Sequence, residues 1–381
     1  MKKVVSLTLL TILSLDAESL VEVFENLEVD GYLRATYQAH DIKSDRVHED
    51  DAIGGKLHLE TGVFYGLSGG VSFYSSNALV NNENRGLVPL RGESHKSYSI
   101  LGEAYLKTEF SETLLKVGRQ EIETPFAQAD DIGMVPNTFE AAMFESRLLK
   151  DTTLVLGQVQ KMAGVDADSV DSFKRLNGSD NMQLLGLSYE GIPHVVLDAW
   201  YYNLKDAEVN KIAYVEASYE KEFKDITFGT ALQYAKQGYS VGESANIYGV
   251  GVDATVKKFG LSVAAAYTEA RDNAAFSGFG GGPFFSNSEY FILDNAGDDA
   301  KAIWFGAEYN AKSMGVEALT VALGEVTLEN KRGEEASELD FTASYEINKN
   351  AEVHLIASKL KGTNVGEDDA KHLRVFANYN F

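Results

Sequence analysis

Apolar and polar residues alternate along much of this chain with a period of two. The clearest case is the segment 338–347, ELDFTASYEI, in which one face carries only apolar or aromatic side chains and the other only polar or charged ones. Similar divisions recur in the segments 195–201, 226–234, 303–309 and 372–381. Successive side chains of a β-strand point to opposite faces, so the pattern predicts strands with one apolar and one water-facing side.

About 18 segments of about 10–14 residues alternate in this way, which is close to the length that a tilted strand needs to cross a bilayer. The links between them alternate between long and short, with one short exception near 206–208. The expected long loops are 41–50, 77–96, 123–136, 163–179, 239–244, 272–298, 329–335 and 361–370, and the expected turns lie at 66–68, 110–112, 311–316 and 347–350 and near residues 150, 191, 224 and 259. Short periplasmic turns and longer external loops are typical of an outer-membrane barrel.

We therefore predict an all-β fold, a transmembrane antiparallel β-barrel of about 18 strands. A soluble sandwich also alternates, but it does not explain the asymmetry of the links. An even strand number places both termini in the periplasm, and closure leaves no unpaired strand edge in lipid. The final residue, Phe381, resembles the C-terminal signal that barrel-assembly machinery recognises.

The N-terminus predicts export. Lys2 and Lys3 precede an apolar run to about Leu15 that is too short to span a bilayer, so residues 1–17 are interpreted as a cleaved signal peptide and 18–381 as one barrel domain. Elsewhere no apolar run of about 18 residues occurs, which excludes a helical membrane protein. The acidic stretch 18–26 is an alternative short helix in the periplasm.

Composition and charge narrow the function. The chain has 19 Tyr, 20 Phe and 34 Gly but only 5 Pro and no Cys, which favours a β-protein. Its net charge of -23 excludes nucleic acid as a partner, because phosphates require a basic surface. Acidic runs such as 49–51, 298–299 and 367–369 are interpreted as solvated loop charge, and divalent-cation bridging to lipopolysaccharide is the weaker alternative.

No motif indicates catalysis, a cofactor or a metal. The Gly- and Phe-rich segment 277–291 lacks the lysine and the following helix of a phosphate-binding loop, so its aromatic residues are expected to fold inward or cover the mouth of the barrel. The seven histidines show no metal-binding spacing, and no GxSxG sequence is present. The chain is therefore predicted not to be an enzyme.

Charged residues on the water-facing side of the strands would select which ions pass. Arg34 in the first strand and Arg374 in the last lie on that side. Closure makes these strands neighbours, so the two guanidinium groups are expected near each other inside the barrel, where they would attract carboxylates. The alternative for each arginine is a position at the lipid interface or a pairing with an acid in the lumen.

The stretch from Leu114 to Ser146, LLKVGRQEIETPFAQADDIGMVPNTFEAAMFES, resembles the OprD-type family of substrate-selective outer-membrane porins. The recognisable pieces are GRQ at 118–120, TP at 124–125 and VPNTFEA at 135–141. GYLRATY at 31–37, GGPFF at 281–285 and the aromatic C-terminus also look like that family. The similarity is dense in 114–146 and sparse elsewhere.

The resemblance implies an 18-stranded barrel, monomeric or loosely trimeric, whose third and seventh loops fold inward. It also implies a row of basic side chains on one wall that faces acidic groups on the other. The candidates for the acidic wall are Asp130 and Asp131 in loop three, and those for the basic wall are Arg34, Arg119, Arg147 and Arg374. Arg119 shares the side of Leu115 and Val117, so it would face inward only if Gly118 made a bulge.

We thus expect a porin in the outer membrane of a Gram-negative bacterium that passes ions, amino acids or small carboxylates by passive or facilitated diffusion. Outer-membrane lipid, lipopolysaccharide and small solutes are the expected partners. The alternative is a plugged barrel that acts as an adhesin or structural anchor. Small residues on the expected inner face favour an open lumen, namely Gly229, Ala231, Gly249, Gly251 and Thr255.

Overall fold

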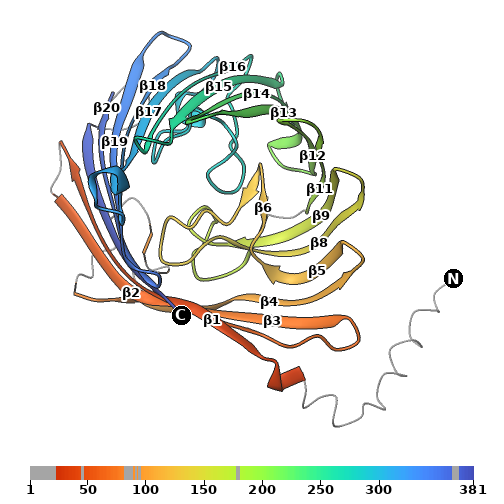
Figure 1. The fold of residues 1–381 in the computed structure, drawn as a ribbon. Coiled ribbons are helices and arrows are strands. Elements are labelled where there is room, and N and C mark those ends of the chain that lie inside the picture. Colours follow the sequence, from red (N-terminus) through yellow and green to blue (C-terminus); the bar gives the residue numbers. More distant parts are fainter. Residues whose placement is uncertain are drawn as a thin grey trace.

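The computed structural model describes residues 23–43, 47–80, 89–90, 92, 96–176, 181–362 and 369–381. In this part of the chain, 18 long strands form one antiparallel sheet. The first strand, β1 (Glu28–Ile42), pairs with β2 (Val47–Glu60) on one side and with the last strand, β21 (Ala370–Asn380), on the other. This pairing closes the sheet into a barrel (Figure 1), which confirms the predicted fold class and strand number.

The remaining long strands follow one another around the barrel, each paired with its neighbours along the chain. They are β3 (Leu67–Ala78), β4 (Tyr98–Phe110), β5 (Thr113–Gln120), β8 (Thr138–Leu149), β9 (Thr152–Ala163), β11 (Met182–Ile192), β12 (Val195–Leu204), β13 (Val209–Phe223), β14 (Ile226–Tyr239), β15 (Ala245–Val256), β16 (Leu261–Arg271), β17 (Lys301–Asn310), β18 (Leu319–Glu329), β19 (Glu335–Asn348) and β20 (Ala351–Lys361). Three two-residue strands lie in links: β6 (Glu123–Thr124), β7 (Ala127–Gln128) and β10 (Lys174–Arg175).

Helical structure in the described residues is short. The 3-10 helices η2 (Leu293–Ala296) and η3 (Ala311–Met314) have four residues each, and residues 23–25 form one helical turn. No helix in this part of the chain is long and apolar enough to cross a membrane. The expected signal peptide, 1–17, lies outside the described residues, so it stays a prediction.

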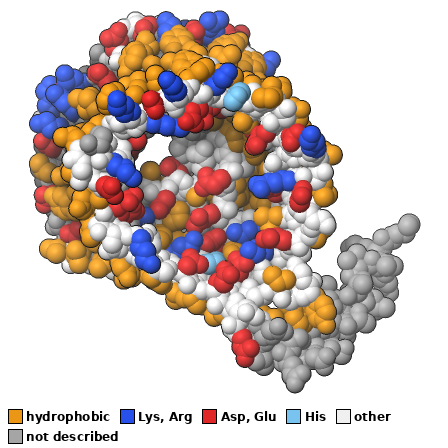
Figure 2. Space-filling view, in the orientation of Figure 1, with side chains coloured by type: hydrophobic (Ala, Val, Ile, Leu, Met, Phe, Trp, Pro, Cys, Tyr) orange, Lys and Arg blue, Asp and Glu red, His pale blue; other side chains and the backbone are white. Residues whose placement is uncertain are grey.

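The apolar face of the strands points outward and the polar face points into the barrel. In β19, Leu339 and Phe341 are exposed, whereas Glu338 and Asp340, which alternate with them, are buried. Figure 2 shows hydrophobic side chains along the outside of the wall and charged side chains around the opening. This arrangement is the reverse of a soluble core and confirms the expected barrel with a lipid-facing exterior and a polar interior.

Most links agree with the sequence, and one differs clearly. The link expected at 41–50 is shorter, because β1 continues to Ile42 and β2 begins at Val47. Charged residues there suggested a loop, yet His40 and His48 pair across the two strands. The exceptionally short link near 206–208 is confirmed, since β12 ends at Leu204 and β13 begins at Val209.

Two long links fold into the lumen, as Figure 1 shows, and we call 121–137 loop three and 272–300 loop seven. They pair directly, because the amide of Gln128 donates to the carbonyl of Phe279 at 2.9 Å and that of Phe279 donates to Phe126 at 3.0 Å. Gly278 permits this approach, since its φ is +94° and a Cβ there would lie 2.5 Å from the Phe126 carbonyl oxygen. The inward folding implied by the resemblance is therefore present.

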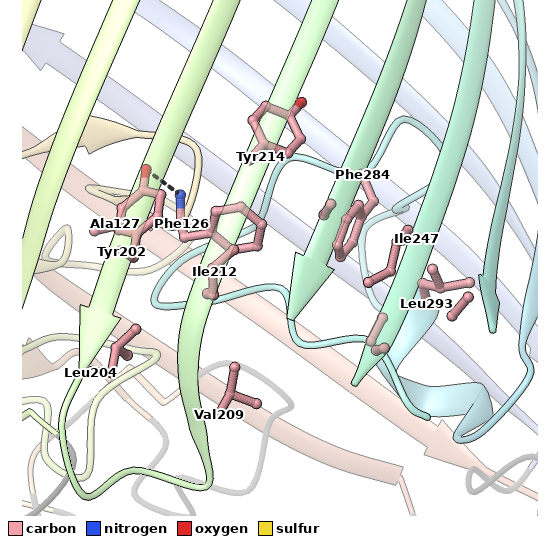
Figure 3. Packing of buried hydrophobic residues seen from close by; sticks show 14 of the residues in the cluster. Phe126, Ala127, Tyr202, Leu204, Val209, Ile212, Tyr214, Ile247, Phe284 and Leu293 are labelled. Atoms are coloured by element: carbon pink, nitrogen blue, oxygen red, sulfur yellow. Dashed lines mark hydrogen bonds between the residues drawn. The ribbon is translucent and has the colours of Figure 1, made fainter. Parts of the chain in front are cut away.

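An apolar cluster attaches both loops to the inner wall (Figure 3). Phe126 of loop three packs edge-on against Tyr202 of β12, Tyr214 of β13 and Phe284 of loop seven. The small inward residues of β15 make room for this packing: Phe285 of loop seven lies 3.4 Å from where a Cβ of Gly251 would be. Part of the space expected to be open water is thus filled by a loop.

Candidate functional site

The wall formed by β1 and β21 carries the two arginines that the sequence analysis placed together. Arg34 stands opposite Asn378, and Arg374 stands opposite Gln38. Both guanidinium carbons lie near the ring of Phe376, at 5.5 Å for Arg34 and 5.3 Å for Arg374. The two guanidinium groups therefore lie on either side of one aromatic ring on this wall.

Arg34 is fully engaged by loop three. Its Nη1 and Nη2 donate to the two carboxylate oxygens of Asp131 at 2.6 and 2.7 Å, and Nη1 also donates to the Gly133 carbonyl at 2.7 Å. Its Nε donates to Asn378 at 2.8 Å. Loop three crosses to β1, so Asp131 contacts a basic residue directly instead of facing it across the lumen. Bidentate pairs of this kind fix geometry, and here the pair anchors the loop.

Arg374 holds loop seven in a similar way but with fewer bonds. Its Nη2 donates to Glu289 at 3.0 Å, and its guanidinium lies 5.9 Å from the ring of Tyr290. The side chain is 2% exposed. Its Nε and Nη1 are buried without a hydrogen-bond partner in the described part of the chain. Arg374 therefore presents no accessible donor to the lumen.

Arg119 and Arg147 lie elsewhere. Arg119 stacks 4.3 Å from Phe173 and donates to the Leu101 carbonyl at 3.1 Å. Gly118 has a φ of +131°, but β5 pairs without a register shift at that point, so the proposed bulge is absent. Arg147 stands at the short-turn end of β8, with its side chain 67% exposed and paired with Glu145 at 2.9 Å. No hydrogen bond or ion pair in the described residues joins either arginine to Asp130 or Asp131.

A cavity of about 650 Å³ lies between the two loops and the inner face of β16–β19. Small residues on that face leave the space, namely Ala264, Gly306, Ala322 and Gly324. The charged residues that line it are all acidic and comprise Asp130, Asp166, Glu289, Glu308 and Asp340. Trp304 and Tyr290 add aromatic surface. We call this space the acidic cavity.

Asp130 and Asp166 form a hydrogen-bonded pair where three links meet. Asp166 belongs to the link 164–181, and it accepts a bond from Asn137 Nδ2 at 2.6 Å. Burial, together with the neighbouring charge of Asp166, raises the pKa of Asp130 to about 7. Burial also raises the pKa of Asp166 and of Glu289. Near neutral pH the Asp130–Asp166 pair therefore holds a proton.

The wall of β2–β5 is charged but internally compensated. Lys56 contacts Glu103 at 3.1 Å and Glu121 at 3.0 Å, and Lys107 contacts Glu60 at 2.5 Å. The sequence analysis did not identify this network or the acids Asp166, Glu289 and Glu308. The inward position of Asp340 and Glu308 could be predicted from the sequence, since both residues alternate with outward apolar residues. No local sequence pattern indicates the positions of the loop residues Asp166 and Glu289.

Comparisons with known proteins agree with this architecture. The family described as "outer membrane porin, OprD family" matches residues 67–381. Pseudomonas aeruginosa OccK9 (OpdG) has a similar structure, with a TM-score of 0.80 at 19% identity over 94% of this chain and 99% of that one. P. aeruginosa OpdK, solved with vanillate, gives 0.80 at 16% over 94% and 99%, and Acinetobacter baumannii OccAB4 gives 0.78 at 17% over 93% and 98%. No curated protein sequence matches the chain.

Proposed function

This chain belongs to the OprD family of outer membrane porins, and from that premise we propose that its lumen favours small hydrophilic solutes that carry a positive charge. It is a channel of the bacterial outer membrane and not an enzyme. Of the solute classes expected from the sequence, the proposal favours inorganic cations and the ammonium group of amino acids over small carboxylates. The solute moves down its own gradient.

The acidic cavity carries the proposal. Its lining includes five carboxylate side chains and no lysine, arginine or histidine. Fixed charges of one sign in a narrow aqueous passage concentrate ions of the opposite sign and repel like ones. Its volume falls within the range of about 300–1,000 Å³ that small-molecule sites occupy. Trp304 and Tyr290 offer ring faces on which a cationic group gains further attraction.

The arginines offset only one of these acids for a passing solute. Arg34 is bonded to Asp131, which does not line the cavity, and Arg374 is bonded to Glu289. Their positive charges therefore hold loops in place. This leaves Glu308 and Asp340, on the strand wall, as the proposed selectivity residues, together with Asp130 on loop three.

The test is the reversal potential of the reconstituted barrel in a planar bilayer under a KCl gradient. We expect cation preference in the wild type and a preference reduced by about half or more when Glu308→Gln and Asp340→Asn are combined. Glu325→Gln, which removes an outward carboxylate of β18, is the matched control and should leave the potential unchanged. Anion preference, or an unchanged potential in the double variant, would contradict the proposal. Correctly folded protein without single-channel steps would favour the plugged anchor instead.

The proposal also covers the macromolecular partners of the barrel. Phe381 exchanges backbone hydrogen bonds with Gly31 at 3.0 and 3.2 Å, so it completes the closing strand pair while the residue is 48% exposed. An exposed aromatic residue at the barrel seam supports recognition of Phe381 by barrel-assembly machinery. Homotrimer formation and contact with lipopolysaccharide stay predictions at this point.

A further inference from the structure

Four lysines gather at the external end of three adjacent strands. Lys359 and Lys361 lie at the end of β20, Lys371 is the second residue of β21, and Lys43 follows β1. With Asp41 and Asp369 they surround a pocket of about 310 Å³. We call these four residues the lysine rim. Figure 2 shows basic side chains gathered at the left edge of the molecule, in the region of β20 in Figure 1.

Three of these lysines belong to the lipid-facing side of the barrel. Lys359 and Lys361 alternate with the buried, inward Ser358 and Leu360, and Lys371 precedes the buried His372. The same outer face continues toward the membrane with apolar residues, namely Ala357, Leu373 and Val375. The lysine rim therefore lies just outside the apolar band, on the side of the long loops, where the headgroups of the outer leaflet are found.

Among the described residues around this pocket, the lysine rim has an excess of positive charge, because four lysines stand beside two aspartates. Lys359 stands directly opposite Lys371, a like-charge pairing that is unfavourable on its own. Lys43 contacts Asp369 at 3.0 Å, which lowers the pKa of that carboxyl. Lys359, Lys361 and Lys371 make no hydrogen bond or ion pair within the described residues. This cluster occurs in a chain whose net charge is -23, so general basicity does not account for it.

We propose that the lysine rim binds a phosphate group of lipid A, the phosphorylated anchor of lipopolysaccharide in the outer leaflet. The ammonium groups of Lys359, Lys361 and Lys371 donate to the phosphate oxygens, and the acyl chains lie along the apolar residues below. Lysine binds phosphate as a compact point charge, and clustered basic residues beside a membrane recognise anionic headgroups in this way. This site concerns the outer surface and is independent of the solute selectivity proposed above.

The experiment measures lipid A binding to the folded full-length barrel in neutral detergent by native mass spectrometry. The test variant combines Lys359→Gln, Lys361→Gln and Lys371→Gln. Each lysine near an anionic surface contributes on the order of a fivefold gain in affinity, so we expect binding at least about tenfold weaker in this variant. Single-channel conductance, recorded in parallel, should match the wild type, because the three side chains lie outside the lumen.

The matched control removes three lysines at the same end of the barrel, on β13 and β14 and in the link before β13, by Lys205→Gln, Lys211→Gln and Lys236→Gln. It should bind lipid A within about twofold of the wild type, because these lysines are not grouped around one pocket. Equal weakening in both triple variants would show attraction by total charge and overturn the proposal. Unchanged binding in the test variant, equal binding of dephosphorylated lipid A, or displacement by millimolar inorganic phosphate would also overturn it.

Discussion

The wall of β1 and β21 and the wall of β16–β19 both carry charges that point into the barrel, but they use them differently. On the first wall Arg34 and Arg374 are buried and bonded to acids of the inward loops. On the second wall Glu308 and Asp340 border an open cavity with no basic residue in its lining. The first wall holds the loops through its arginines, whereas the second, which also holds loop seven through Glu338 and Asp340, leaves Glu308 facing the solute.

The difference shows that inward direction alone does not identify a selectivity residue. A paired charge in a confined site has its field largely cancelled by its partner, whereas an unpaired charge beside water acts on passing ions. Arg34 has four hydrogen bonds to the protein and Glu308 has none among those described. The comparison therefore assigns anchoring to the arginines of the first wall and selection chiefly to Glu308 of the second.

Substitution of Arg34 should have the largest effect and tests most directly whether the β1–β21 wall anchors the loops. In Arg34→Gln, loop three loses the bidentate pair with Asp131, and each hydrogen bond to a charged group contributes about 1.5–3 kcal/mol. We expect loop three to leave the wall and open-channel conductance to rise on the order of twofold, because conductance follows the free cross-section. Single-channel recording measures the change.

The charge-neutral variant Arg34→Gln with Asp131→Asn separates anchoring from charge. It removes the pair without changing the net charge of the lumen, so conductance should rise as in the single variant. Arg34→Lys should be intermediate, since lysine keeps the charge but cannot form the bidentate bond. A conductance equal to the wild type in all three variants would show that the ion pair does not hold the loop.

Local patterns in the sequence were sufficient to predict the barrel. They were not sufficient to predict which of its inward charges form ion pairs. The alternation of β19 separates Leu339 from Asp340 without further information, because each strand of a membrane barrel separates lipid from water. The same alternation of inward and outward residues also placed Arg34 and Arg374 inside the barrel. The contact between Arg34 and Asp131 joins residues 97 positions apart through an irregular loop, and no periodic signal records such a contact. For this reason the arginines were expected to face the solute.

A change of pH should alter the ion selectivity of the acidic cavity, by a smaller amount than the substitutions above. The pKa of Asp130 is raised to about 7 by burial and by Asp166, so its carboxyl is neutral below pH 7 and negative above it. An ordinary aspartate is already ionised by about pH 5. Cation preference in the wild type should therefore increase between pH 6 and pH 8, as the acidic cavity gains negative charge.

The reversal potential at several pH values measures this dependence. Asp130→Asn removes the titrating group and should flatten the profile, whereas Glu325→Gln removes an outward carboxylate of β18 and should preserve its slope. If the Asp130→Asn profile keeps the wild-type slope, another group titrates in this range, and Asp130 does not set the pH dependence.

The smallest effect is expected from Arg374→Gln. Burial already raises the pKa of Glu289, and Arg374 partly counteracts that increase, so removing the arginine should raise this pKa further and favour the neutral carboxyl. The lost positive charge is thereby partly offset, and the reversal potential should change less than in Glu308→Gln with Asp340→Asn. Glu289→Gln should lower the thermal unfolding temperature more than Arg374→Gln, because it leaves a buried guanidinium with no partner. A selectivity shift in Arg374→Gln as large as that of the acidic double variant would mean that Arg374 acts on the solute, and the division between the two walls would be wrong.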